Sequence, residues 1–248
     1  MAYAREKRFI IECIRSYLGN NDSDKIRRLY NKSSFEKLTE LIESQNIEGF
    51  FYHLYLNKHL DKIKIPDKTI DKWKKVSGKN LLINTLNDDE TLTIVKEFNK
   101  RKIDYTYIKG LSTRKRCYEN NYIKGSCDID LFIKKNDYKK TKELLIENGY
   151  EIPYKYYNDD VDIAIPFKDY EKRAFEISFV KKKAKLKYSI DLHWDFFFTD
   201  KKTIFNDLYD KKTFFGLNKR NILRIDSKKI NVFSLEDEFI YIAFHYVL

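Results

Sequence analysis

The chain has 248 residues, which is enough for one large domain or two small ones. Hydrophobic residues make up 42% of it and aromatic residues 16%, so a disordered polymer is excluded although 35% of the residues are charged. The net charge of +11 favours an anionic partner, such as a nucleotide, a nucleic acid or an acidic membrane surface, but solvated lysines in a lysine-rich composition account for it equally well.

The first 100 residues are predicted to be helical. The stretch SSFE predicts a capping box, with Ser33 as the N-cap and Glu36 three residues later. The aromatic stretch FFYHLYL (50–56) is expected to form a buried helix, and Pro66 suits the first turn of one or two further helices. Apolar residues recur at helical spacing near the start of the chain, at Ile10, Cys13, Ile14, Tyr17 and Leu18.

Strand patterns begin after residue 100. The stretch DYTYIK (104–109) is predicted to be a strand that ends at Gly110, and LSTRKRCYE can form a short helix directly after it. A second strand is expected over CDIDLFI (127–133). It is followed by a helix that we expect to be capped by Asn136 and to end at Gly149.

The rest of the chain predicts four strands, a hairpin and a helix. The strands are expected over YEIPYKY, VDIAIPF, AFEISFVKK and YSIDLHWDFF, and the hairpin over NILRIDSKKINVF. The last helix is expected to have Ser234 as its N-cap and Asp237 as a capping-box partner. Because the sequence stops at Leu248 inside an apolar stretch, we expect either a truncated chain or an end that packs against a neighbour.

These elements predict an α/β fold, or α+β in looser terms, with a mixed sheet, flanking helices and a helical region alongside. Three parts are expected: a helical N-terminal region (1–100), a core that carries the chemistry (101–200), and a C-terminal hairpin and helix (201–248).

Cysteine content and hydropathy favour a cytoplasmic protein. The three cysteines are odd in number and widely spaced, which argues against a disulfide framework or a zinc knuckle and favours reduced thiols. No apolar run approaches the ~20 residues of a membrane span, and FIIECI (9–14) is too short for a signal-peptide core. We therefore expect no membrane partner.

Three aspartates are candidates for a metal site. Asp128 and Asp130 should share one face of their strand, because side chains alternate between faces. Hard carboxylate oxygens that face one way can hold Mg²⁺, which takes substrate phosphates among its other ligands. Asp191, from a later strand, would complete a site for two metal ions. The alternatives are an edge-strand device against aggregation for the pair and a solvent-facing residue for Asp191.

The turn after the first strand is a candidate phosphate site. Gly110 lets the backbone turn closely, and Ser112 lies at the start of the next helix, where N–H groups can hold a phosphate. Lys109 precedes the turn as either a phosphate contact or a solvated lysine. His193 shares a face with Asp191, so it either contacts substrate or is a packed, hydrogen-bonded histidine.

The order of strand, Gly-x-Ser, helix and Asp-x-Asp resembles the nucleotidyltransferase superfamily to which DNA polymerase beta belongs. More narrowly, the stretch from YIKGLST to IENGY (107–150) is similar to a bacterial family of uncharacterised nucleotidyltransferases. The strand IDLHW and the helix SLEDEFIYIAFH also fit that family. The resemblance covers about residues 104 to 245.

The resemblance implies a role for each matching residue. In such enzymes the Gly-x-Ser turn holds the nucleoside triphosphate, and two Mg²⁺ ions are bound by the carboxylates. Carried over, the catalytic metal ligands are Asp128, Asp130 and Asp191. The triphosphate-binding role carries over to Gly110 and Ser112, and the expected nucleotide-binding set adds Lys109, Lys124 and His193. Lys124 stands where the family usually has arginine, so a bidentate phosphate contact becomes a point charge.

Three functions remain open. The first is a Mg²⁺-dependent enzyme that transfers a nucleoside monophosphate from a nucleoside triphosphate to a hydroxyl or phosphate of a small-molecule or peptide acceptor, with release of pyrophosphate. The second is a nucleic-acid-directed transferase, for example one that acts on tRNA ends, which the charge of +11 would suit. The third is a non-catalytic nucleotide-binding interaction protein, against which the three carboxylates argue. The sequence identifies neither the base nor the acceptor nor the oligomeric state.

Overall fold

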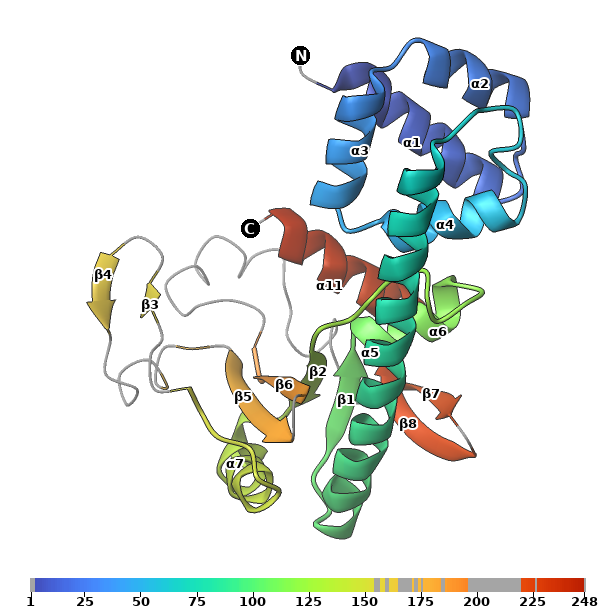
Figure 1. The fold of residues 1–248 in the computed structure, drawn as a ribbon. Helices are drawn as coiled ribbons and strands as arrows, with labels where there is room; N and C mark the ends of the chain where they lie inside the picture. Colours follow the sequence, from blue (N-terminus) through green and yellow to red (C-terminus); the bar gives the residue numbers. More distant parts are fainter. Residues whose placement is uncertain are drawn as a thin grey trace, which may run out of the picture. The chain divides into compact units, whose positions relative to one another are not determined.

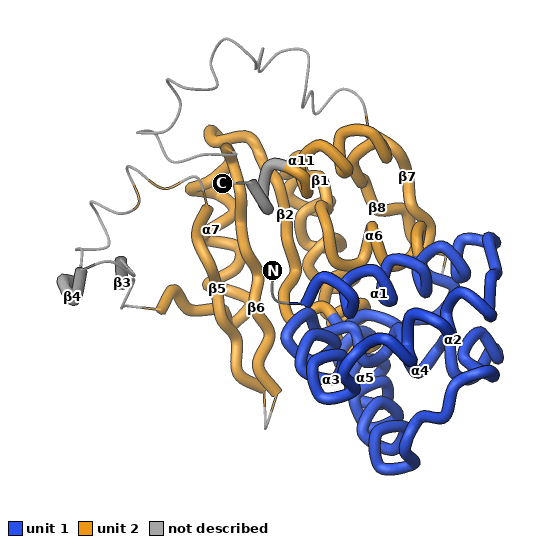
Figure 2. Tube along the Cα trace, turned by 90° about the horizontal axis from the view of Figure 1, so that it is seen from above, with its two compact units in different colours: residues 1–84, 118–125 blue, residues 85–117, 126–248 orange. Residues whose placement is uncertain are grey.

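The computed structural model describes residues 3–153, 157–158, 161–164, 171, 174, 176–183, 186–195, 220–225 and 227–247, without side chains at 157–158, 161–164 and 244–247. These residues form eight α-helices, a six-stranded mixed sheet and a two-stranded sheet (Figure 1). The expected α+β fold with flanking helices is thereby confirmed. Two compact units divide the chain, one of residues 1–84 and 118–125 and the other of residues 85–117 and 126–248 (Figure 2). The three-part division expected from the sequence stays a prediction.

The first unit is built from helices around an aromatic core. They are α1 (Ala4–Tyr17), α2 (Ser23–Asn31), α3 (Phe35–Ser44), α4 (Glu48–Leu56) and the first half of α5 (Asp67–Lys100). The predicted aromatic helix is α4, in which Phe51 and Leu54 are fully buried. The segment that follows Pro66 is one continuous helix rather than two.

The N-cap of α3 is Ser34, so the prediction of Ser33 was wrong by one residue. The Ser34 hydroxyl accepts a hydrogen bond from the Lys37 N–H at 3.3 Å and donates to the Glu36 carboxylate at 2.7 Å. The Ser33 hydroxyl instead donates to the Leu29 carbonyl at 2.9 Å, at the end of α2. Either serine fits the sequence signature, and the end of the preceding helix selects the second.

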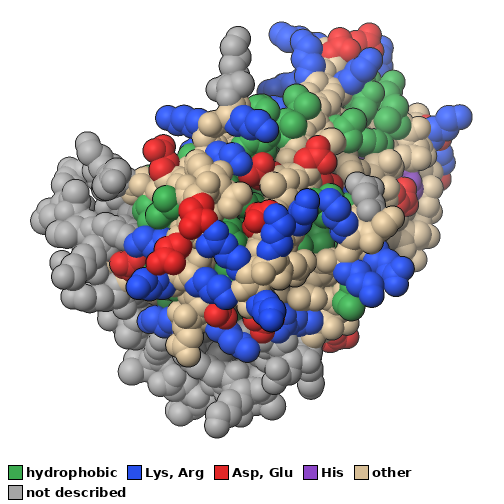
Figure 3. Space-filling model, turned by 90° about the horizontal axis from the view of Figure 1, so that it is seen from below, with side chains coloured by type: hydrophobic (Ala, Val, Ile, Leu, Met, Phe, Trp, Pro, Cys, Tyr) green, Lys and Arg blue, Asp and Glu red, His purple; other side chains and the backbone are tan. Residues whose placement is uncertain are grey.

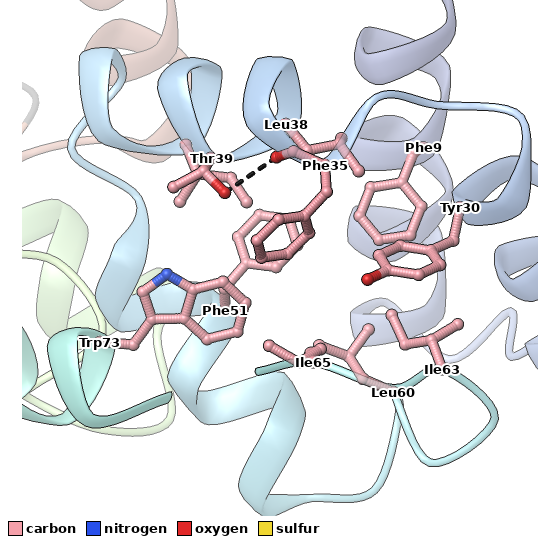
Figure 4. Close-up of a pocket in the computed structure, with 11 residues that line it drawn as sticks. Phe9, Tyr30, Phe35, Leu38, Thr39, Phe51, Leu60, Ile63, Ile65 and Trp73 are labelled. Carbon is pink, nitrogen blue, oxygen red and sulfur yellow. Dashed lines mark hydrogen bonds between the residues drawn. The ribbon is translucent and has the colours of Figure 1, made fainter. Parts of the chain in front are cut away.

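A small apolar cavity lies inside the first unit (Figure 4). Its volume is about 10 Å³, which is no more than one water needs. Rings of Phe9, Phe51 and Trp73 line it, and the Thr39 hydroxyl beside it donates to the Phe35 carbonyl at 2.9 Å. We assign no ligand to this cavity because it is far smaller than a nucleotide.

The loop of residues 118–125 is fastened within the first unit by asparagines of α5. Asn80 Nδ2 donates to the Tyr122 carbonyl at 3.2 Å, and Asn84 Nδ2 donates to the Lys124 carbonyl at 2.9 Å. A Cβ atom on Gly49 would lie 2.5 Å from the Tyr122 carbonyl oxygen, so only glycine lets α4 approach this loop so closely.

The second unit contains the six-stranded sheet. Its strands are β1 (Tyr105–Ile108), β2 (Ile129–Ile133), β5 (Glu176–Lys183), β6 (Leu186–His193), β7 (Arg220–Ile225) and β8 (Lys228–Phe233), in the order β5-β6-β2-β1-β8-β7. β2 runs parallel to β6 and antiparallel to β1. The separate pair is β3 (Tyr157–Asn158) and β4 (Val161–Ala164). The helices are the second half of α5, α6 (Gly110–Cys117), the 3₁₀ turn η1 (Lys135–Asp137), α7 (Tyr138–Glu147) and α11 (Leu235–Val247).

Helices cover both faces of this sheet. The second half of α5 and α7 pack on one face, where Phe98 and Leu144 join the main core with apolar residues of β1, β2, β5, β6 and β8. On the other face, Tyr241 of α11 joins a smaller cluster with Ile108 and Phe132. The side chains of chemical interest lie on this second face, beside α11.

In the second unit, two predicted helix ends are confirmed and one is wrong. Gly149, at a φ of +82°, ends α7 as expected, and Ser234 Oγ accepts the Asp237 N–H at 3.1 Å as the expected cap of α11. The prediction of Asn136 as a cap was wrong, because η1 leads directly into α7. In the expected strand YEIPYKY, Glu151 forms a single bridge to Val180. Parts of that stretch, of VDIAIPF and of YSIDLHWDFF, and Leu248, lie outside the described residues.

Candidate functional site

Two of the three candidate aspartates are neighbours on adjoining parallel strands. Asp130 of β2 and Asp191 of β6 are Cα partners in the strand register. Their flanking residues Ile129 and Ile190 point to the main core, so alternation places both carboxylates on the α11 face. Asp128 directly precedes β2. The sequence-based expectation that these side chains lie close together agrees with this register.

The carboxylates strongly affect one another. Burial, reinforced by the charges of Asp130 and Asp191, raises the pKa of Asp128 to about 6. Burial also raises the pKa of Asp191, with the Asp130 charge adding to it and a hydrogen bond from Ser178 opposing it. Asp191 Oδ1 is buried and has no hydrogen-bond donor among the described residues. The cluster therefore has more negative charge than its neighbours neutralise.

His193 is buried between two carboxylates. Its Nε2 lies 3.1 Å from Asp130 Oδ1, and its Nδ1 lies 3.0 Å from Glu176 Oε2 of β5. Burial by itself would lower the pKa of His193, but the hydrogen bonds to Asp130 and Glu176 raise it to about 9. The imidazole is 1% exposed, so the structure favours the hydrogen-bonded alternative over direct substrate contact.

Lys109 is the other cation beside Asp130. Its Nζ lies 3.5 Å from Asp130 Oδ1 and 4.9 Å from the centre of the Tyr241 ring. The Lys109 backbone has a φ of 54°, a left-handed conformation that is uncommon for a residue other than glycine. Although burial pushes the pKa of Asp130 upwards, hydrogen bonds and charges from His193 and Lys109 hold it below its ordinary value.

Gly110 allows the turn to approach the segment before β2. A Cβ atom there would lie 2.7 Å from Ser126 Oγ, and the φ of Gly110 is +29°. The Ser126 hydroxyl donates to the Asp128 carbonyl at 3.0 Å, and Asn87 of α5 donates to the Ser126 carbonyl at 2.8 Å. Ser126 thus links the glycine turn to the aspartate pair, which the sequence did not indicate.

Ser112 is fully buried and contacts α11. Its hydroxyl donates to Glu238 Oε2 at 2.7 Å and accepts from Arg116 at 2.7 Å, and Thr113 Oγ1 also donates to Glu238. The Ser112 N–H donates to the Lys109 carbonyl at 2.8 Å. A contact between Ser112 and nucleotide stays a prediction, and it requires these bonds to rearrange.

Lys124 belongs to the first unit. Its Nζ donates to the carbonyls of Gln45 and Asn46 at 3.4 and 3.2 Å. Its predicted contact with the nucleotide also stays a prediction.

Besides Ser126, sequence reasoning missed Glu176, Tyr241 and Glu238 near the site. Glu176 was within reach of the sequence only through strand register, because it is the partner of His193 when β5 pairs antiparallel with β6. Tyr241 and Glu238 were not, because the sequence does not indicate where a helix that begins over 100 residues after the turn will pack.

Metal ligands are not pre-assembled in the described part of the chain. It contains no group of three His, Cys, Asp or Glu side chains arranged to hold a metal ion. Asp128, Asp130 and Asp191 nevertheless supply the hard oxygens that Mg²⁺ prefers, and Asp191 Oδ1 lacks a donor. The residues therefore fit a Mg²⁺ ion that completes its coordination with waters and phosphate oxygens.

Comparison with known proteins gave one match. The model of a family described as "Uncharacterised nucleotidyltransferase" matches residues 31–247. Neither the search of curated proteins nor the search of solved structures found a match. No helix within the described ranges combines the length and the apolar character needed to cross a membrane.

Proposed function

The chain belongs to the uncharacterised nucleotidyltransferase family and is a nucleotidyltransferase by that membership, and from this premise we propose its reaction. It transfers a nucleoside monophosphate from a nucleoside triphosphate to a hydroxyl or phosphate of a small-molecule or peptide acceptor. Pyrophosphate leaves, and the reaction depends on Mg²⁺. The observation that carries this proposal is the pairing of Asp130 with Asp191 on adjoining strands, beside the Lys-Gly turn.

Mg²⁺ is held in this proposal by Asp128, Asp130 and Asp191. The buried Asp191 oxygen without a donor and the raised pKa of Asp128 both support a cation there, because a positive charge stabilises the ionised carboxylates. When bound, the ion neutralises charge on the phosphate oxygens. The described residues contain no three side chains already arranged to hold a metal ion. In this proposal, oxygens of the triphosphate supply the missing ligands.

Lys109 and the turn at Gly110 orient the triphosphate. Lys109 Nζ lies on the carboxylate side of the turn, where an ammonium can contact a phosphate oxygen as a point charge. The absence of a Cβ at Gly110 lets the turn lie against Ser126, in the segment before β2, so that Lys109 stands beside Asp130. His193 does not contact the nucleotide in this arrangement, and acts through Asp130 instead.

Thermal shift and pyrophosphate release test the proposal together. A triphosphate should raise the melting temperature only weakly in EDTA and clearly with Mg²⁺, because metal and nucleotide bind jointly. All four triphosphates are screened against cell extract, with products identified by mass spectrometry. Asp128→Asn and Asp130→Asn should abolish pyrophosphate release, whereas Asp89→Asn, an exposed aspartate of α5, should keep it. Equal stabilisation in EDTA, or full turnover by both site variants, contradicts the proposal.

A nucleic-acid end is the alternative acceptor, and the net charge of +11 favours it. Among the side chains drawn in colour in Figure 3, however, Lys and Arg lie interspersed with Asp and Glu. Affinity for tRNA that falls steeply with salt, and tRNA that blocks transfer to small acceptors, would support this alternative. Nucleotide binding without any pyrophosphate release would point to a non-catalytic binding protein.

A further inference from the structure

Three side chains form a hydrogen-bonded chain across three strands. Glu176 and His193 are Cα partners on β5 and β6, and their side chains meet at Nδ1 of the imidazole. His193 Nε2 then reaches diagonally to Asp130 on β2. The imidazole is 1% exposed and the Asp130 side chain 6% exposed, whereas Glu176 at the edge is 32% exposed.

Acceptors on both sides of an imidazole fix its orientation and its protons. A histidine that binds only Asp130 could rotate about its side-chain bonds or use its other nitrogen. With Nδ1 held by Glu176, the Nε2–H group must point towards Asp130. The Tyr241 hydroxyl is 3.5 Å from Nδ1, which is too long to replace the carboxylate as a strong acceptor.

His193 also determines which oxygen of Asp130 is available. Both cations that contact this carboxylate, His193 and Lys109, meet Oδ1. Oδ2 has no donor among the residues that the structure describes. The two donors thus fix the rotation of the carboxylate and leave one oxygen for a further ligand.

We propose that Glu176 is a positioning residue of the site: it holds His193, which in turn holds Asp130 with Oδ2 presented to a divalent cation. This inference rests on the proposed function, because it assumes that Asp130 binds the metal. It adds Glu176, which is not one of the expected metal ligands, and it changes the role of His193 from nucleotide contact to support of Asp130.

Three variants of Glu176 separate positioning from a general structural role. Glu176→Ala removes the acceptor for Nδ1, Glu176→Gln keeps a neutral acceptor of the same length, and Glu176→Asp keeps the charge on a shorter side chain. Glu151→Ala is the matched control, because Glu151 is exposed and contacts β5 only through its backbone bridge to Val180.

The first measurement is NMR of the ¹⁵N-labelled histidines, without metal. The chain has four histidines, and the signals of His193 are assigned by their loss in His193→Gln. We expect two protected N–H signals for His193 in the wild type. Glu176→Ala should lose the Nδ1–H signal, and Glu176→Gln should retain it. Unchanged signals in Glu176→Ala would show that Glu176 does not hold the imidazole and would overturn the inference.

The second measurement is the affinity for Mn²⁺, used as a paramagnetic probe together with a non-hydrolysable triphosphate. Loss of a residue that orients a metal ligand typically weakens metal affinity ~10–100-fold, and we expect that range for Glu176→Ala. Glu176→Gln should recover most of the affinity, and Glu151→Ala should match the wild type. Should Glu176→Ala fail to fold, the shorter Glu176→Asp decides in its place, with weaker binding supporting the inference and wild-type binding overturning it.

The outcomes distinguish this inference from the proposed function. If the wild type binds Mn²⁺ and Glu176→Ala binds it equally well, Glu176 has no positioning role and the proposed function stands. If the wild type binds no Mn²⁺ with or without triphosphate, the proposed function fails and the inference fails with it.

Discussion

The two faces of strands β2 and β6 contain opposite chemistry, although residues alternate between them along the same short stretches of chain. One face contributes fully buried apolar residues to the main core, namely Ile129, Leu131, Ile133, Ile190 and Leu192. The other face carries Asp130, Asp191 and His193, beside Lys109 and Glu176. Buried polar groups destabilise a fold unless they are paired, and here the pairing is incomplete at Asp191. If the proposed function is right, the apolar face mainly stabilises the fold and the polar face supplies the chemistry, and substitutions on the two faces should have different effects.

The largest effect should come from the polar face. Asp128→Asn or Asp130→Asn keeps the shape and removes one negative charge from the site. Transfer activity should fall on the order of 10²–10³-fold or more, the size typical of losing one electrostatic group at an active site. Folding stability without metal should stay level or rise for Asp128→Asn, because like-charge repulsion is relieved. Pyrophosphate release and urea unfolding measure the two effects on the same samples.

The apolar face should respond in the opposite way. Leu131→Ala leaves a cavity in the main core, and we expect a loss of about 2–5 kcal/mol in the free energy of unfolding. Below the melting temperature, Mg²⁺-dependent nucleotide binding should change little. Urea unfolding and nucleotide titration check this pair of results. A Leu131→Ala protein that is fully stable but has lost nucleotide binding would break the comparison.

The pH dependence of stability sharpens the comparison on the polar face. The folded pKa of His193 is raised from 6.5 to about 9, so its stabilising contribution is complete below pH 6.5 and is lost as the pH rises through 9. The loss should be on the order of 3 kcal/mol, and His193→Gln should flatten it. The pKa of Asp128 is raised from 3.8 to about 6, so ionisation of this carboxyl group destabilises the fold as the pH rises through that range. Urea unfolding at pH 6.5 and pH 9 isolates the histidine.

The smallest effect is expected at Ser112. Its substitution should affect both stability and nucleotide binding, each to a modest extent. Ser112→Ala removes a buried donor to Glu238, and we expect a loss of about 1–3 kcal/mol in stability. If the hydroxyl also contacts nucleotide, as the sequence predicts, triphosphate affinity should fall modestly as well. Thermal unfolding and nucleotide titration decide whether Ser112 is a structural residue, a nucleotide contact or both.

The sequence predicted those parts of the site that depend on local pattern. Alternation predicted a shared face for Asp128 and Asp130, although Asp128 directly precedes β2 and does not lie within it. The Gly110 turn was recognisable from its strand and helix. The hydrogen bond from the Ser112 hydroxyl to Glu238 was not predictable, because Glu238 lies 126 residues later in the chain. The choice of Ser34 over Ser33 depended on where the preceding helix ends.

Strand register explains why the sequence did not predict the partner of His193. His193 was placed on the correct face from its spacing to Asp191, but its partner Glu176 appears only when β5 is aligned with β6 residue by residue. A one-residue shift of that register would turn Glu176 to the opposite face. Side-chain partners across strands are therefore the part of this site that one sequence determines least.

The left-handed backbone of Lys109 has a consequence for engineering. A lysine in this conformation costs about 1–2 kcal/mol relative to an ordinary backbone, and asparagine tolerates it better. Lys109→Asn relieves this backbone strain but also removes the ammonium group that stabilises the buried Asp130 carboxylate, so the two effects oppose each other and the melting temperature should change little. A screen that selects variants for heat resistance alone would not reject this substitution, although in the proposed function it removes the contact between Lys109 and the triphosphate. Residue 109 is thus a position where thermostability and turnover should be selected together.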